Sequence, residues 1–143
     1  IYAGAAADPS CRNQRSLENR IRKKKEAGAQ FIQTQMIMER ENLIEFCEKI
    51  AKPLVIPVIA GVFLLKSYKN ALFINKHVPG ANIPENILNR LKDAKNPLEE
   101  GIQIAAEQAQ DFFYIANGIH LMAVKTENLI PEILEKANLN LEY

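Results

Sequence analysis

The chain has 143 residues, enough for one domain with a core, and its Lys and Arg total of 18 nearly balances 17 Asp and Glu. The resulting net charge of +1 argues against a dedicated nucleic-acid-binding protein. The longest apolar stretch, Leu54–Leu65, contains Pro57 and Gly61 and is too short to span a bilayer. Cys11 and Cys47 lack metal-ligand spacing, so we expect no metal site and two thiols in a reducing compartment, the cytoplasm.

Apolar periodicity and turn residues predict strands that alternate with helices along the chain. In chain order we expect a strand at Ile1–Ala7, a helix at Ser16–Ala27, a strand at Phe31–Met38, a helix at Arg40–Ile50, a strand at Leu54–Ala60, helices at Lys66–Lys76, Glu85–Leu91 and Leu98–Ile115, a strand at Ile119–Val124, and a helix at Thr126–Lys136. Ser16 is the expected N-cap of the first helix, and Gly28 is its expected stop.

This order of elements is typical of a parallel α/β fold. A complete (β/α)8 barrel needs roughly 250 residues, so four strand–helix units correspond to half of one. A flavodoxin-like open sheet is the alternative, although no Gly-rich phosphate loop follows the first strand. The first residue, Ile1, is not methionine and lies inside a predicted strand, so we expect part of a longer chain. Residues 1–143 are predicted to form one partial barrel without a second domain.

The strand at Phe31–Met38 carries the first candidate for ligand binding. Side chains alternate along a strand, so Gln33 and Gln35 share the face opposite Ile32 and Thr34. A buried glutamine without partners costs roughly 1–3 kcal/mol, and ligands of parallel α/β folds gather at the C-terminal ends of strands. Gln35 is therefore a candidate ligand contact. The alternative is a structural glutamine bonded to neighbouring backbone.

The helix at Ser16–Ala27 carries the second candidate. Arg20 and Lys24 are four residues apart and share one helical face, with Lys23 beside them. Such cations can bind an anion, most naturally a phosphate. The alternative is an ordinary solvated face.

The two histidines and one pair of carboxylates give weaker signals. His120 lies in the last predicted strand, where a packed core histidine is the main alternative to an acid/base role. His77 lies near a loop and is expected to be exposed. Glu99 and Glu100 lie at a helix start, where the helix dipole favours carboxylates, so we do not expect them to be catalytic.

Together these segments resemble the C-terminal half of the methylenetetrahydrofolate reductase family, in the branch of anaerobic bacteria and archaea. The matching stretches are GAAADP at Gly4–Pro9, KKKEAGAQFIQTQ at Lys23–Gln35, IPVIAGV at Ile56–Val62, NIPENILNRL at Asn82–Leu91, LEEGIQIAAE at Leu98–Glu107 and GIHLMAV at Gly118–Val124.

The resemblance implies a (β/α)8 barrel that holds FAD at the C-terminal strand ends and reduces methylenetetrahydrofolate to methyltetrahydrofolate by hydride transfer through the flavin. It implies FAD contacts at Ala6, Asp8, Arg20, Lys23 and Lys24. It implies folate contacts at Gln35 and at Asn70, where the family has a glutamine. Lys125 and Thr126 stand where some members of the family carry a substrate-binding arginine.

The family's catalytic glutamate and a flavin-proximal aspartate lie on earlier strands that have no counterpart here, so no catalytic residue is expected in this segment. Open sheet edges invite pairing, and we expect the remaining barrel half, a second polypeptide or a second copy of the chain as partner. The electron donor, NAD(P)H or a redox subunit, and the choice between folate and a related pterin stay open. Two alternative functions are a non-catalytic barrel subunit or scaffold of a larger redox complex and a pterin-binding methyltransferase.

Overall fold

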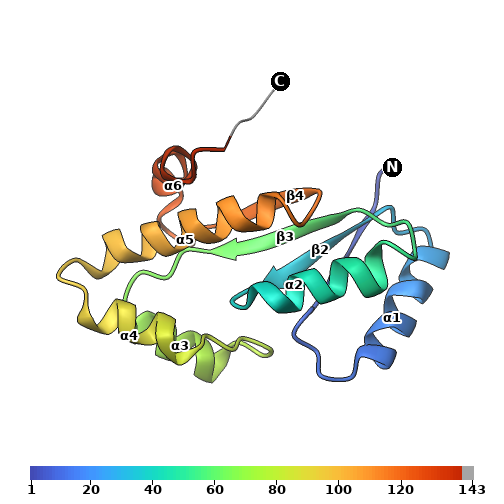
Figure 1. The fold of residues 1–143 in the computed structure, drawn as a ribbon, viewed down its shortest axis with the longest axis horizontal. Helices are drawn as coiled ribbons and strands as arrows, with labels where there is room; N and C mark the ends of the chain where they lie inside the picture. Colours follow the sequence, from blue (N-terminus) through green and yellow to red (C-terminus); the bar gives the residue numbers. More distant parts are fainter. Residues whose placement is uncertain (140–143) are drawn as a thin grey trace. The chain divides into compact units, whose positions relative to one another are not determined.

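A computed structural model describes residues 1–139 of the chain. Its elements can be followed in Figure 1. In chain order they are β1 (Gly4–Ala7), α1 (Gln14–Glu26), β2 (Phe31–Met36), α2 (Arg40–Phe46), the π-helix η1 (Cys47–Ala51), β3 (Val58–Phe63), α3 (Tyr68–His77), α4 (Glu85–Asp93), α5 (Pro97–Phe113), β4 (Gly118–Met122), the 3-10 helix η2 (Glu127–Leu129) and α6 (Ile130–Ala137).

The four strands form one sheet in the order β1-β2-β3-β4, which is also their order along the chain. The pairs β1–β2 and β2–β3 are parallel, with Ala6 opposite Gln33 and Gln33 opposite Ile59. The predicted α/β class with four parallel strands is confirmed. Because consecutive parallel strands are neighbours, their C-terminal ends meet along one edge, where the candidate residues of β1 and β2 lie.

Several predicted strand bounds are wrong. The first strand begins at Gly4 instead of Ile1, the second ends at Met36 instead of Met38, and β4 ends at Met122. The third begins at Val58 instead of Leu54, because the apolar residues before it close a turn after η1. Val55 has a φ of 50° and its N–H donates to the Lys52 carbonyl, so this apolar stretch forms a turn, in which Ile56 is buried and Val55 is exposed.

The helices depart from prediction mainly at their starts. Ser16 is not the cap of α1: the Asn13 side chain accepts the Ser16 N–H at 2.9 Å, and α1 starts at Gln14. The first helix does end before Gly28, which has a φ of 105°. The helix predicted over Arg40–Ile50 changes from α2 to the wider η1 at Cys47. The last helix is preceded by the 3-10 turn of η2 instead of opening at Thr126.

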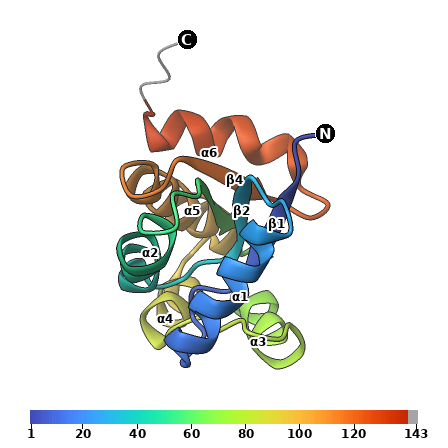
Figure 2. The ribbon, with the colours of Figure 1, turned by 90° about the vertical axis from the view of Figure 1, so that its right-hand side faces the viewer.

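The chain divides into two compact units, of which the first comprises residues 1–61 and 112–120. In it α1 lies beside β1, as Figure 2 shows. Its core is made by aliphatic and aromatic side chains from the buried faces of the helices and strands, among them Leu17, Ile21, Ile32, Leu43, Phe46, Ile50, Val58 and Phe112. The predicted inner face of the first helix, Leu17 and Ile21, is confirmed.

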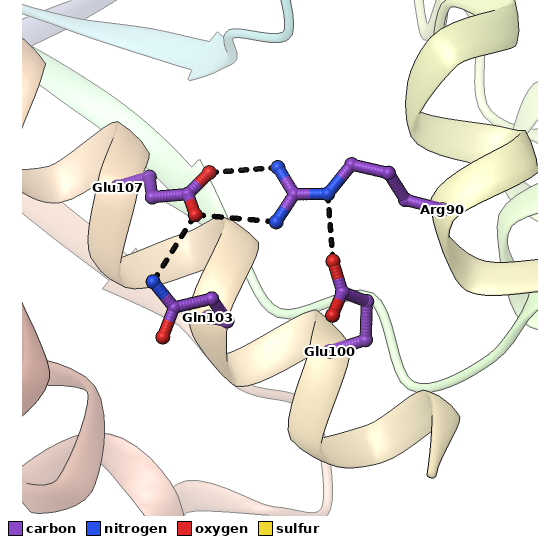
Figure 3. Close-up of polar contacts among 4 residues, drawn as sticks. All are labelled: Arg90, Glu100, Gln103 and Glu107. Carbon is purple, nitrogen blue, oxygen red and sulfur yellow. Dashed lines mark hydrogen bonds and ion pairs between the residues drawn. The ribbon is translucent and has the colours of Figure 1, made fainter. Parts of the chain in front are cut away.

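The second unit comprises residues 62–111 and the described part of the chain from Leu121. In it α3 and α4 lie side by side (Figures 1 and 2). Arg90 of α4 reaches two carboxylates of α5, as Figure 3 shows. Its Nε donates to Glu100 at 2.6 Å, and its two terminal nitrogens donate to Glu107 at 2.7 and 3.2 Å. These contacts tie α4 to α5.

Glu107→Gln should lower the free energy of unfolding by about 1 kcal/mol at neutral pH, since a half-exposed network is screened by solvent. The hydrogen bond from Arg90 lowers the pKa of Glu107 below its ordinary value of 4.5. A lowered folded-state pKa gives stability that is present above the ordinary value and lost as the pH falls through the lowered one. The difference between wild type and variant, measured by urea unfolding of the full-length protein, should therefore shrink in acid. Glu135→Gln on α6 is the charge-matched control, and an equal loss there would contradict the network.

Candidate functional site

The C-terminal end of β2 is shaped by an irregular pairing with β3. Gln33 lies opposite Ile59, but Met36 lies opposite Gly61, so β2 has one extra residue in this interval. The Thr34 hydroxyl accepts the Gly61 N–H at 2.9 Å and donates to the Gln35 carbonyl at 2.7 Å. A Cβ on Gly61 would lie 2.7 Å from the Gln35 carbonyl oxygen, so the close approach of the two strands requires glycine.

Gln35 itself is exposed at this strand end, not buried as the sequence suggested. Gln35 follows the alternation of the strand, in which Ile32 and Thr34 are buried on one face while Gln33 is half-buried and Gln35 exposed on the other. A buried amide needs hydrogen-bond partners inside the protein. An exposed amide can bond to water instead, so Gln35 does not require a partner within the protein. The proposed contact with a ligand stays a prediction.

A cavity of about 200 Å³ lies at the C-terminal ends of β1 and β2. Its lining combines small side chains of β1, the inner face of α1 and the Gln35 amide: Ala6, Ala7, Asp8, Leu17, Arg20, Ile21, Lys24 and Gln35. Five of the seven residues that the sequence singled out thus meet in one place. Lys23 and Asn70 are not among them.

Lys24 is fixed against the strand end. It continues the stripe of Leu17 and Ile21 on α1 and is half-buried, and its Nζ donates to the Ala6 carbonyl at 2.5 Å. Arg20, one turn earlier, is exposed and donates from Nη2 to the Cys11 Sγ at 3.2 Å. These two cations therefore stand on the cavity side of α1.

Lys23 lies on an adjoining surface of the same helix. A hollow of about 360 Å³ there is lined by polar and basic side chains of α1 and its N-cap: Asn13, Arg15, Ser16, Asn19, Arg20 and Lys23. Arg20 lines both this hollow and the strand-end cavity. The basic surface of α1 is thus continuous from Lys23 to Lys24 through Arg20.

Asp8 and Asn70 each have a local structural partner. The Asp8 Oδ1 accepts the Ser10 N–H at 3.0 Å and the Ser10 hydroxyl at 2.5 Å, which shapes the loop after β1. In the second unit, the Asn70 Oδ1 accepts the Lys66 N–H at 3.1 Å at the start of α3. The roles in flavin and folate binding expected for these residues stay predictions.

Sequence reasoning missed a polar pair inside the sheet. The Gln33 Nε2 lies 2.7 Å from the His120 Nδ1, and both side chains are half-buried. His120 is therefore a half-buried strand histidine with a polar hydrogen-bond partner. Alternation had placed Gln33 on the Gln35 face, but nothing in the sequence shows that a residue 87 positions away lies opposite it.

The remaining titratable groups add little to the site. Cys11 and Cys47 are free thiols. Burial, with the Glu48 carboxylate, raises the pKa of the Cys47 thiol to about 11, which makes it a poor nucleophile. His77 is exposed, as expected, with its ring 4.4 Å from that of Phe73. Within residues 1–139, no group of three or more His, Cys, Asp and Glu is placed to hold a metal ion.

Across the described helices, none combines the length and apolar character needed to cross a bilayer.

Comparison with known proteins finds a match between residues 3–138 and the family model for methylenetetrahydrofolate reductase. The chain is 28% identical over 128 residues to methylenetetrahydrofolate reductase 2 of Saccharomyces cerevisiae. It is 26% identical over 127 residues to methylenetetrahydrofolate reductase 1 of Schizosaccharomyces pombe. Each alignment covers 83% of this chain but only 21% of the yeast protein, so the chain spans about a fifth of these relatives.

Among solved structures, the fold is similar to that of an uncharacterized protein from Clostridium thermocellum that binds two copies of 5-methyl-5,6,7,8-tetrahydrofolic acid. The TM-score is 0.70 at 18% sequence identity, over 94% of this chain and 51% of that one. This likeness supports the predicted fold, part of a (β/α)8 barrel, and the chain spans about half of the solved protein.

Proposed function

Because the chain belongs to the methylenetetrahydrofolate reductase family, we propose that it forms the flavin- and folate-binding part of an enzyme that converts methylenetetrahydrofolate to methyltetrahydrofolate. The observation that carries the proposal is the strand-end cavity, in which the Gln35 amide meets Arg20 and Lys24. An amide can donate and accept side by side, which suits the edge of a pterin ring. Folate binding by the similarly folded Clostridium thermocellum protein supports the same ligand class.

The donor set of the cavity fits FAD. Arg20 and Lys24 supply the charge-assisted hydrogen bonds that a pyrophosphate or phosphate requires, and Lys23 extends the same basic surface. Ala6 and Ala7 leave room for a flat ring to approach the end of β1. When bound, the flavin would supply hydride transfer. The role of this chain is to bind and orient: Lys24 is held by the Ala6 carbonyl, and Gln35 faces solvent at the neighbouring strand end.

The proposal requires partners outside this chain. No catalytic acid is assigned to its residues, so the remaining barrel strands, from the same polypeptide, a second polypeptide or a second copy, would supply it. NAD(P)H or a redox subunit would be the electron donor. A scaffold or a pterin-dependent methyltransferase built on the same half barrel would lack the flavin, which makes flavin content the discriminating property.

The proposal is tested by supplying the full-length protein with FAD, a reductant and methylenetetrahydrofolate without oxygen, and measuring methyltetrahydrofolate by mass spectrometry. We expect catalytic formation of methyltetrahydrofolate that depends on added FAD. Product formation that is independent of flavin would contradict the assigned chemistry, and absence of product with full flavin occupancy would contradict the reductase function.

Lys24→Ala should lower FAD affinity roughly ten- to a hundredfold, because one charge-assisted hydrogen bond of about 1.5–3 kcal/mol is removed. The measurement is a flavin titration followed by fluorescence quenching in the full-length protein. Lys52→Ala, which removes an exposed lysine paired only with Glu48 on η1, is the matched control and should retain wild-type affinity. If Lys24→Ala bound FAD with wild-type affinity, the basic face of α1 would be an ordinary solvated face and not a flavin contact.

A further inference from the structure

We propose that Gln33 holds His120 as the tautomer with its hydrogen on Nε2, and that this N–H is a hydrogen-bond donor to a heteroaromatic ring bound inside the barrel. The inference rests on the proposed function, since the ring is that of the flavin or the pterin. Gln33 is a positioning residue in this account, and His120 is the residue that touches the ligand.

The contact between Gln33 and His120 fixes which nitrogen of the imidazole carries the hydrogen. An amide nitrogen can only donate, so at 2.7 Å the Gln33 Nε2 must meet a ring nitrogen that accepts. In an uncharged imidazole one nitrogen accepts and the other carries the hydrogen. Because Nδ1 is the acceptor, the hydrogen is on Nε2. The tautomer of His120 is thereby set by its neighbour.

Gln33 and His120 lie on the face of the sheet that corresponds to the barrel interior. Ile32 and Thr34 are buried on one face of β2, and Gln33 between them faces the other side, as Ile59 does in the paired β3. β2 and β4 are alternate strands in the order β1-β2-β3-β4, so the Gln33–His120 contact spans β3. In a (β/α)8 barrel, inward side chains of alternate strands form layers of the interior. The pair is half of one such layer.

The Gln33–His120 pair lies close to the strand-end cavity along β2. Gln33 lies two residues before Gln35, about 6–7 Å nearer the start of β2 at ordinary strand rise. The pair therefore lies beneath the strand end where Gln35 lines the cavity. An interior layer made of aliphatic side chains would stabilise a barrel better than polar ones, because each buried polar group must be paired. Recognition of a ring nitrogen or carbonyl oxygen instead requires a hydrogen-bond donor in a fixed orientation. The His120 Nε2–H, oriented by Gln33, would be such a donor.

The test uses full-length protein labelled with 15N-histidine, whose His120 signals are assigned from a His120→Gln sample. We expect an Nε2–H signal with Nδ1 unprotonated. Gln33→Glu keeps the side-chain shape but replaces the donor with an acceptor, and the hydrogen should move to Nδ1. FAD and methyltetrahydrofolate are added in separate samples, and a shift of the Nε2–H signal with one of them identifies which ring accepts the bond.

Gln33→Glu should also lower kcat/KM for methylenetetrahydrofolate roughly tenfold, the value for one lost hydrogen bond. Gln30→Glu, at the other end of the strand, is the matched control. A wild-type Nδ1–H tautomer would overturn the proposal, as would an Nε2–H signal that neither ligand moves. If the wild type formed no methyltetrahydrofolate while FAD or folate shifted this signal, the proposed function would fail but the donor role would stand.

Discussion

Gln35→Ala in the full-length protein should lower kcat/KM for methylenetetrahydrofolate roughly ten- to a hundredfold while flavin content stays at the wild-type level. Without the Gln35 amide, one polar group of the bound pterin would lose its hydrogen-bond partner in a pocket from which water is excluded. This loss weakens binding by on the order of 1–3 kcal/mol. Flavin binding should survive, because the cations assigned to it, Arg20 and Lys24, lie on α1 and not on β2.

The measurement is the rate at which methylenetetrahydrofolate reoxidises the reduced enzyme, with flavin content determined on the same sample. Gln110→Ala removes an exposed glutamine from α5 and is the matched control. A wild-type rate in Gln35→Ala would leave Gln35 as a structural residue of the strand end. Loss of flavin together with the rate would mean that Gln35 shapes the cavity as a whole.

Gly101→Ala should lower the free energy of unfolding by about 2 kcal/mol, although alanine is the better helix former by about 1 kcal/mol. A Cβ on Gly101 of α5 would lie 1.8 Å from the Leu65 carbonyl oxygen, which is backbone and has no side-chain freedom to move aside. The helix must therefore shift away from the segment after β3, with loss of packing around Ile102 and Ala105, both buried.

Urea unfolding of the full-length protein measures this effect. Gly118→Ala is the matched control, because its added Cβ would meet Ile59 at 3.9 Å, an ordinary contact. The control should change stability by less than 1 kcal/mol. Equal stability of Gly101→Ala and wild type would show that α5 does not approach the backbone at Leu65 this closely.

The sequence predicted the parallel fold because its signals are local. Gly28 after α1 and the apolar stripe of Leu17 and Ile21 both act within a few residues, and each is where it was expected. The predicted strand start at Leu54 is wrong because the apolar run continues from the strand into the turn before it, where Ile56 is buried but Val55 is exposed. The turn is distinguished from a strand by its backbone, because Val55 adopts a positive φ.

Of the seven residues that the sequence singled out, five line the strand-end cavity, and Lys23 and Asn70 do not. Helical spacing put Arg20 and Lys24 on one face, and a strand end put Gln35 near them. What the sequence could not show are contacts between segments that are distant along the chain: the Lys24 bond to Ala6, the irregular pairing of β2 with β3 after Gln33, and the bond between Gln33 and His120. A shift of one residue in the register of β2 would turn Gln33 and Gln35 to the other face of the sheet.

The most direct test of the account is the absorbance spectrum of the purified full-length protein after incubation with FAD and removal of unbound flavin. The account predicts a retained flavin spectrum, close to one FAD per complete barrel, that is lost in the double variant Arg20→Ala/Lys24→Ala. A colourless wild-type protein, or a double variant that keeps its flavin, would contradict the assignment of the strand-end cavity to FAD.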